Sequence, residues 1–389
     1  MIIYQSWNCS WRSIMGLTRR MVLKTWCYLC LFGLILTASS NIRAEDMPDP
    51  QELFQKVINS YQSVDYIGKM TMMFLGPGGR SSVSEAIVYR ETPDKWRIEF
   101  IWPDEIKGRG MASVGEKRWP IKRERGTRDR RFMWHPPGRM LEEMPLKSIK
   151  LILRNYYIHI LQGGSIAGRD TYMIELEPKE GGRPSRKIWV DKEKGVMLKI
   201  EHYDTQKRPV GFYTFSEIQY NPKIDESLFR EPEDHDDRPL DRGPRRSERS
   251  ELWDHGKGKL DIERITKEVE LDLIIKAEIP AGFVLQSIES MKFGRHKNVH
   301  LKYTDGMVVV SVFQSRKRPP RPRDQDNPSP PRDDEMKDIK IDGVSGQEKQ
   351  AGPVYILRWN YKKLDFTLIG ELNKDSMIRI AKTLIKEAG

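Results

Sequence analysis

Apolar and polar positions alternate along much of the chain between residues 70 and 220, and this pattern predicts a sheet. The clearest strand covers residues 95–102. Its apolar side chains share one face, because successive side chains of a strand point to opposite faces. Further strands are predicted within residues 70–74, 83–90, 111–134, 171–177, 186–191, 196–203 and 211–220.

Helical spacing of apolar positions interrupts this pattern twice. Leu53, Val57 and Tyr61 recur at the helical period within residues 49–64, and a second helix is predicted over residues 146–157. The order of one helix, many strands, a helical interruption and more strands favours a large antiparallel sheet that packs against helices.

A second block of alternating positions follows residue 262. Thr304-Asp305-Gly306 predicts a tight hairpin turn of the Asp-Gly type between two of its strands. The block ends in a predicted helix, for which Asn373 is the candidate cap and whose apolar face includes Met377 and Leu384. Its strands are predicted at residues 283–290, 299–303, 307–314, 354–359 and 364–369.

Two charged stretches break the pattern and suggest the domain boundaries. Residues 233–261 hold few large apolar groups, so they cannot bury enough surface to offset the entropy cost of ordering. Residues 315–350 contain six prolines and mixed charge. We therefore predict a domain over 45–232, a linker over 233–261, and a domain over 262–389 with a disordered insertion at 315–350.

The first 44 residues are typical of an export signal. Three bases within residues 18–24 precede an apolar run at 26–38 that is short for a membrane span, and small residues follow up to Ala44. We predict a cleaved signal peptide and a periplasmic location; an uncleaved N-terminal anchor is the alternative. Residues 18–24 are weakly similar to a twin-arginine signal, so the Sec and Tat export routes both stay open.

Composition narrows the class of protein. The chain has 389 residues, enough for two domains, and its 32% charged residues exclude a polytopic membrane protein. The first 44 residues hold five bases and no acid, so the net charge of +11 falls to +6 without them. This mild excess argues against a nucleic-acid partner. All three cysteines lie in the same segment, so the mature chain is predicted to have no disulfide and no thiolate metal site.

Common catalytic motifs are missing from the sequence. It has no Gly-x-x-x-x-Gly-Lys-Ser/Thr phosphate loop, no His-Glu-x-x-His metal motif and no Gly-x-Ser-x-Gly nucleophile elbow. His296 and His300 fall on a predicted loop and strand, and the acidic run at 233–237 is predicted to be solvated linker. We therefore predict a protein that is not an enzyme and that has no cofactor and no metal site.

A basic patch is the first candidate binding surface. Residues 107–131 hold ten bases against three acids, which suits anionic lipid headgroups at a membrane surface or an acidic protein partner. A solvated sheet face is the alternative. The candidate contact residues are Lys117, Arg118, Lys122, Arg123, Arg125, Arg128, Arg130 and Arg131.

Methionine and aromatic side chains on predicted strand faces are the second candidate. Large adaptable apolar groups suit a cavity for acyl chains. Ordinary core packing is the alternative. The candidate cavity residues are Met70, Met72, Phe74, Trp96, Ile98, Phe100 and Trp102.

Several short motifs resemble the RseB/MucB family of periplasmic sigma-E regulatory proteins. Residues 279–283 (Ile-Pro-Ala-Gly-Phe) are similar to its Leu-Pro-x-Gly-Phe segment, and residues 301–312 to its Tyr-Ser-Asp-Gly-Leu and Ser-Val hairpin. Residues 368–381 resemble its Val-Gly-Glu-Leu-Pro and Arg-Ile-Ala ending. In the first block, residues 166–169 and 188–191 also match, in the same order.

The first block is also similar to the lipoprotein carriers LolA and LolB. Around residues 92–96 the carriers have Arg-Pro followed by Phe, and Trp96 keeps the aromatic position. Thr92 stands where carriers have an arginine that helps to lock a lid over the empty cavity. This departure argues against a shuttle.

The resemblance implies an α+β fold: an unclosed antiparallel β-barrel with helices in its concavity, then a smaller C-terminal α/β domain. Family members bind the periplasmic part of a single-span anti-sigma factor and shield it from proteolysis, and lipidated molecules release it under envelope stress. A lipoprotein or lipid carrier is the alternative function. The candidate partner residues in the second block are Tyr303, Asp305, Gly306, Gly370 and Glu371.

Overall fold

The computed structural model describes residues 47–75, 81–115, 117–122, 149–231, 265, 273–293, 296–317 and 336–387. The described residues from Pro48 onward belong to one compact unit. The predicted signal peptide and the predicted linker lie outside the described residues, so both stay predictions.

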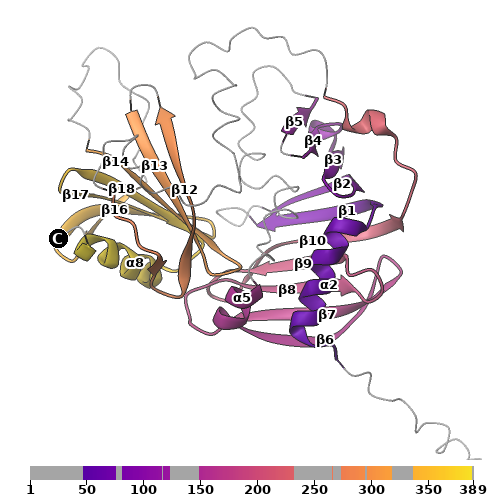
Figure 1. The fold of residues 1–389 in the computed structure, drawn as a ribbon, viewed down its shortest axis with the longest axis horizontal. Coiled ribbons are helices and arrows are strands. Elements are labelled where there is room, and N and C mark those ends of the chain that lie inside the picture. Colours follow the sequence, from indigo (N-terminus) through magenta and orange to yellow (C-terminus); the bar gives the residue numbers. More distant parts are fainter. Residues whose placement is uncertain are drawn as a thin grey trace, which may run out of the picture. The chain divides into compact units, whose positions relative to one another are not determined.

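The first sheet has ten antiparallel strands in the order β5-β4-β3-β2-β1-β10-β9-β8-β7-β6 (Figure 1). The edge strands β5 and β6 do not pair with each other, so the sheet is unclosed, as predicted. Its elements are α2 (Pro50–Ser63), β1 (Tyr66–Leu75), β2 (Ser81–Glu91), β3 (Lys95–Trp102), η2 (Asp104–Ile106), β4 (Gly110–Val114), β5 (Lys117–Ile121), α5 (Ile149–Asn155), β6 (Tyr156–Ile166), β7 (Arg169–Pro178), β8 (Ser185–Asp191), β9 (Met197–Tyr203), β10 (Pro209–Tyr220) and η4 (Glu226–Phe229).

Strand register places the apolar side chains of the first sheet in rows. Met70 of β1 lies opposite Ala86 of β2 and Phe215 of β10, and Ala86 lies opposite Phe100 of β3. Directly opposed residues of antiparallel strands share a face. A row of large and small side chains therefore crosses four strands on the buried face.

Helix α2 lies across the first sheet (Figure 1). It begins within one residue of the predicted start. The Asp49 side chain caps it by accepting hydrogen bonds from the backbone N–H groups of Gln51 and Glu52, at 2.8 and 3.2 Å. Its buried apolar residues are Leu53, Phe54 and Val57.

The region after α5 departs from the prediction. The helix expected over residues 146–157 ends at Asn155, and β6 follows at once. No strand was predicted there, because Gly163 and Gly164 look like a turn. They lie instead inside β6, where the register with β7 shifts between Gln162 and Gly164 in a β-bulge.

The second sheet has eight antiparallel strands in the order β11-β12-β13-β14-β18-β17-β16-β15. The terminal helix has the predicted cap, because the Asn373 side chain accepts a 3.0 Å hydrogen bond from the Ser376 N–H. The elements are β11 (Glu278–Ile279), β12 (Phe283–Phe293), β13 (His296–Thr304), β14 (Val309–Arg316), β15 (Lys337–Ile341), β16 (Val344–Ala351), β17 (Val354–Tyr361), β18 (Leu364–Gly370) and α8 (Lys374–Glu387). Two antiparallel sheets with few helices confirm the predicted fold class.

The turn at residues 304–306 is wider than predicted. Thr304 pairs with Val309, so four residues connect β13 to β14. The Asp305 carboxylate accepts hydrogen bonds from the N–H groups of Met307 and Val308, at 2.9 and 2.7 Å. These bonds stabilise an Asx-type loop in place of the two-residue turn.

The predicted disordered insertion at 315–350 is wrong in its last third. Residues 337–341 and 344–351 form the hairpin β15–β16. Most side chains of β16 are polar, so no alternation of apolar residues indicates this strand. Ile341 of β15, by contrast, is fully buried. Residues 318–335 lie outside the described residues.

Candidate functional site

Six of the seven predicted cavity residues lie on one face of the first sheet. We call Met70, Met72, Phe74, Trp96, Ile98 and Phe100 the apolar wall. All are buried except Phe74, which is partly buried against the same cluster. They belong to one hydrophobic cluster with Leu53, Phe54 and Val57 of α2. An acyl chain that contacts the wall must therefore displace side chains already packed there.

Polar bonds hold the C-terminal half of α2 to the sheet. The buried Arg90 guanidinium donates hydrogen bonds to the carbonyl oxygens of Tyr61 and Pro93, at 2.7 and 2.8 Å. The Ser60 hydroxyl donates to the carbonyl oxygen of Gly195, at 2.9 Å. These bonds act together with the buried Leu53, Phe54 and Val57, so α2 is held to the sheet by both polar contacts and apolar packing.

Two buried donors of the wall's face have no hydrogen-bond partner: the Trp96 Nε1–H and the Tyr213 hydroxyl. Tyr213 lies opposite Met72, and burial raises the pKa of its hydroxyl, so it stays protonated. An unpaired buried donor costs about 1–3 kcal/mol. A ligand with an acyl chain and a carbonyl oxygen would satisfy both the apolar surface and such a donor.

Trp102 is not part of the apolar wall, which corrects the prediction. Phe100 lies opposite Ala86, but Trp102 lies opposite Glu85, so Ile101 is an extra residue in β3. After this bulge, the side chains of β3 point to the opposite faces of the sheet from those that simple alternation predicts. Trp102 therefore shares a face with Glu85 and is 48% exposed.

The structure describes only part of the predicted basic patch. Lys117 and Arg118 lie on β5 and Lys122 follows it, and all three are exposed. The other five residues, Arg123, Arg125, Arg128, Arg130 and Arg131, lie outside the described residues. The patch therefore stays a prediction.

A buried polar cluster forms around Asp305, which is fully buried. Its carboxylate accepts hydrogen bonds from the Tyr156 hydroxyl at 2.7 Å and from Nη1 of Arg183 at 3.2 Å. The Asn155 side-chain amide donates to the backbone carbonyl of Asp305 at 2.8 Å. Burial, and secondly the Asp305 charge, raise the pKa of Tyr156 well above its ordinary value.

This Asp305 cluster joins segments far apart in the sequence. Asn155 and Tyr156 stand at the α5–β6 junction and Arg183 in the β7–β8 loop, whereas Asp305 belongs to the second sheet's β13–β14 loop. The approach is close, because a Cβ on Gly282 would lie 2.2 Å from Oδ1 of Asn155. The Arg183–Asp305 ion pair therefore joins the β7–β8 loop of the first sheet to the β13–β14 loop of the second.

The predicted partner residues of the second sheet are mostly internal. Tyr303 is fully buried, and its hydroxyl donates to the carbonyl oxygen of Lys276 at 3.1 Å. Gly306 and Gly370 are also buried, and Glu371 is partly buried. The structure thus places Asp305 and Gly306 against the first sheet, and their predicted contact with a partner stays untested. Sequence reasoning missed Arg183, whose Gly-Gly-Arg-Pro setting indicated only a turn.

Among the described residues, no three His, Cys, Asp or Glu side chains are grouped so that they could hold a metal ion. In the same residues, no helix combines the length and the apolarity needed to cross a membrane.

Family models match two segments of the chain. The model described as the MucB/RseB N-terminal domain matches residues 130–232. A model described as a domain of unknown function, DUF4367, matches residues 279–384. The solved structure of MucB in complex with MucA(peri) has a TM-score of 0.53 and 13% identity, over 86% of this chain and 97% of that chain. Residues 130–232 are therefore similar to the MucB/RseB N-terminal domain, and the chain shares the fold of MucB.

Two further proteins are similar to this chain. The MucA/MucB complex of Pseudomonas aeruginosa has the same TM-score of 0.53 and identity of 13%, also over 86% and 97% of the two chains. A curated protein of Methanocaldococcus jannaschii is 23% identical over 250 residues, which are 62% of this chain. The chain spans 65% of that relative's length.

Proposed function

We propose that this MucB/RseB-like protein is a non-enzymatic periplasmic regulator that binds the periplasmic part of a single-span anti-sigma factor. The fold that it shares with MucB, a protein solved in complex with MucA(peri), is the observation that carries the proposal. The match of residues 130–232 to the MucB/RseB model supports it.

Partner binding is tested by crosslinking in the host. The tagged protein is purified after crosslinking, and the proteins joined to it are identified by mass spectrometry. We expect one single-span membrane protein whose gene lies beside that of a sigma factor. Recovery of many lipoproteins without such a protein would favour the alternative, a carrier of the LolA type.

We further propose that an acylated ligand binds at the apolar wall and lowers the affinity for the partner. The unpaired donors of Trp96 and Tyr213 support a ligand with both an acyl chain and a carbonyl oxygen. By linkage, a ligand changes partner affinity only if it binds one of two states more tightly, and the effect is reciprocal.

The paired substitutions Trp96→Glu and Trp102→Glu test the site. Both place a carboxylate on β3, but Trp96 is 6% exposed and Trp102 is 48% exposed. A buried carboxylate is costly to desolvate, so we expect Trp96→Glu to abolish binding of a fluorescent palmitoyl lipopeptide and Trp102→Glu to preserve it. If Trp96→Glu does not fold, Trp96→Phe replaces it in the binding assay. This substitution keeps an apolar ring and removes the N–H donor. Binding unchanged by all three substitutions would refute the site.

A further inference from the structure

Strand β6 is an edge strand without the usual protection. It has eleven residues, Tyr-Tyr-Ile-His-Ile-Leu-Gln-Gly-Gly-Ser-Ile, with no acid, no Lys or Arg and no proline. The other edges within the described residues are short: β5 and β15 have five residues each and β11 has two. β5 holds two bases and a proline, and β15 holds two bases and an acid. Charges, prolines and short length are the devices that keep sheet edges from pairing.

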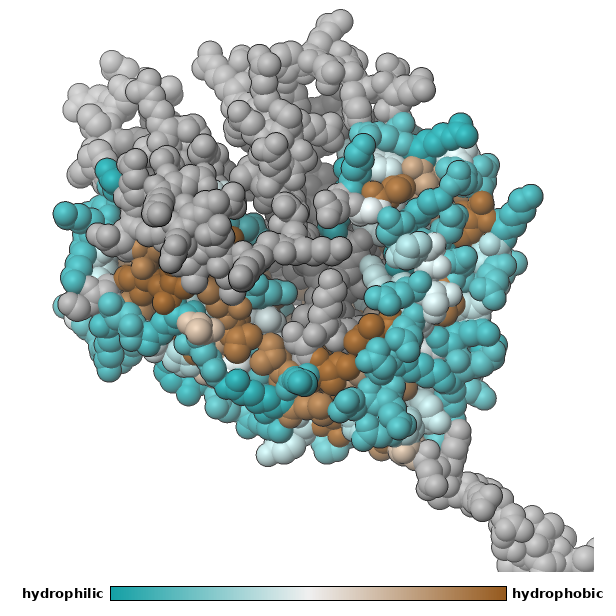
Figure 2. Space-filling view, viewed as in Figure 1, coloured by the Kyte–Doolittle hydropathy of each residue, from teal (hydrophilic) through white to brown (hydrophobic). Residues whose placement is uncertain are grey.

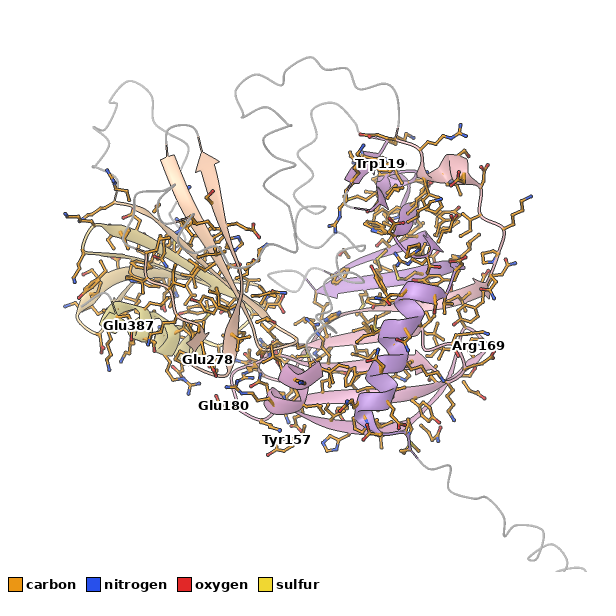
Figure 3. All side chains as sticks on the ribbon, in the orientation of Figure 1. Trp119, Tyr157, Arg169, Glu180, Glu278 and Glu387 are labelled. Carbon is orange, nitrogen blue, oxygen red and sulfur yellow. The ribbon has the colours of Figure 1, made fainter. Side chains whose placement is uncertain are left out.

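Both faces of β6 carry apolar side chains. Tyr157 is 55% exposed and Leu161 is 47% exposed on the outer face, whereas Ile158 and Ile160 are partly buried against the core on the other face. Figure 3 shows Tyr157 at the border of the sheet opposite to that of Trp119 in β5. Figure 2 shows hydrophobic residues gathered low on this face, in the region where Figure 1 draws α5 and the neighbouring strands.

We propose that β6 binds an extended apolar segment of a partner protein as an eleventh strand. The outward N–H and C=O groups of an edge strand select an extended backbone, and alternate side chains supply specificity. The register is regular from Tyr156 to Gln162, before the bulge. The added strand therefore has room for about seven residues, with apolar side chains next to Leu161 on one face and next to Ile160 on the other.

Charge around β6 defines the occupant further. Lys150 of α5 and Lys179 are exposed, and Nζ of Lys179 donates to the carbonyl oxygen of Leu153 at 2.9 Å and lies 5.6 Å from the centre of the Tyr157 ring. The acidic Glu177, opposite Tyr157 on β7, is already paired with Lys207. An apolar segment that ends in an acidic residue at this position complements them. A second copy of β6 brings no acidic residue, and the net charge of each chain, +6 without the predicted signal peptide, opposes self-pairing.

Peptide selection tests the proposal. The protein, expressed with its own export segment and purified as the cell processes it, is used to select random peptides of about ten residues, a length that matches the strand. The selected peptide is synthesised with a fluorescent label, and its affinity is measured by anisotropy. We expect apolar peptides with an acidic residue at one end, and no binding after N-methylation of alternate backbone amides.

Leu161→Lys and Val83→Lys form a matched pair of variants. Val83 is 41% exposed on β2, and five strands (β1, β10, β9, β8 and β7) separate β2 from β6 in the pairing order, so the same charge there leaves the β6 edge unchanged. We expect Leu161→Lys to weaken peptide binding about tenfold or more, and Val83→Lys to leave it unchanged, since an edge lysine opposes pairing. Tyr157→Lys replaces Leu161→Lys if the latter does not fold.

Two results would overturn the proposal. One is that no selected peptide, or only peptides indifferent to Leu161→Lys, binds the protein. The other is a dimer in sedimentation that Leu161→Lys dissociates, because the occupant of β6 would then be a second copy of the chain.

Discussion

The ion pair between Arg183 and Asp305 gives the sharpest prediction for stability. The Arg183 side chain is 2% exposed and that of Asp305 is fully buried. Arg183→Met keeps much of the volume but leaves the Asp305 carboxylate without its countercharge. Breaking a buried pair by removing one partner costs about 3–5 kcal/mol. Asp305 keeps the hydrogen bonds from Tyr156, Met307 and Val308, so we expect about 3 kcal/mol, at the lower end of that range.

The assay is guanidinium unfolding followed by tryptophan fluorescence. A pair with an exposed arginine gives the control: Nη2 of Arg208 lies 2.7 Å from the Asp204 carboxylate, and the Arg208 side chain is 69% exposed. We expect Arg208→Met to cost less than about 1 kcal/mol, since surface pairs contribute little. The double variant Arg183→Met/Asp305→Asn should lose less than the sum of its two single variants, because it removes both buried charges together.

Equal costs for Arg183→Met and Arg208→Met would refute this reasoning. Such a result would mean that Arg183 and Asp305 are hydrated in solution, and that the ion pair does not hold the two sheets together.

Three further predictions concern single positions. Ile98→Ala should cost about 2–5 kcal/mol in unfolding free energy, because Ile98 is buried. Trp102→Ala should cost about 1 kcal/mol or less, because the bulge turns Trp102 outward, and equal costs would contradict the bulge. Burial opposes ionisation of Asp191, but hydrogen bonds from Arg169, the Lys194 N–H, Tyr220 and the Glu193 N–H outweigh it and hold its pKa below the ordinary 3.8. The stabilisation from ionised Asp191 is complete above pH 3.8 and is lost as the pH falls through the lower pKa of the folded state. The difference in unfolding free energy between wild type and Asp191→Asn, measured by urea titration, should therefore close in acid. A difference that stays constant with pH would exclude this role of Asp191. Asn373→Ala should lower the free energy of unfolding by about 1 kcal/mol in the same titrations, and no loss would show that the cap bond is not formed.

The sequence predicted elements whose local pattern agrees with their final environment. Helix α2 and strand β3 have one apolar face and one polar face, and α8 has both a cap and an apolar face. These features are local, so the pattern of the chain alone indicates them.

Features that depend on distant residues escaped prediction. The bulge that turns Trp102 outward is set by pairing with β2, and the glycines of β6 resemble a turn until β7 pairs with them. Asp305 looked like a turn residue, because its partners Arg183 and Tyr156 are more than a hundred residues away in the chain. The polar strand β16 was taken for disorder for the same reason, since pairing and not apolar periodicity defines it.

The central claim is that an acylated ligand and the membrane-anchored partner favour different states of one protein. The most direct measurement is the affinity of the purified protein for the periplasmic part of the crosslinked partner, with and without saturating palmitoyl lipopeptide. We predict that the lipopeptide weakens partner binding about tenfold, within the usual range of coupling, and that Trp96→Glu removes this effect. An affinity that the lipopeptide leaves unchanged would contradict the account.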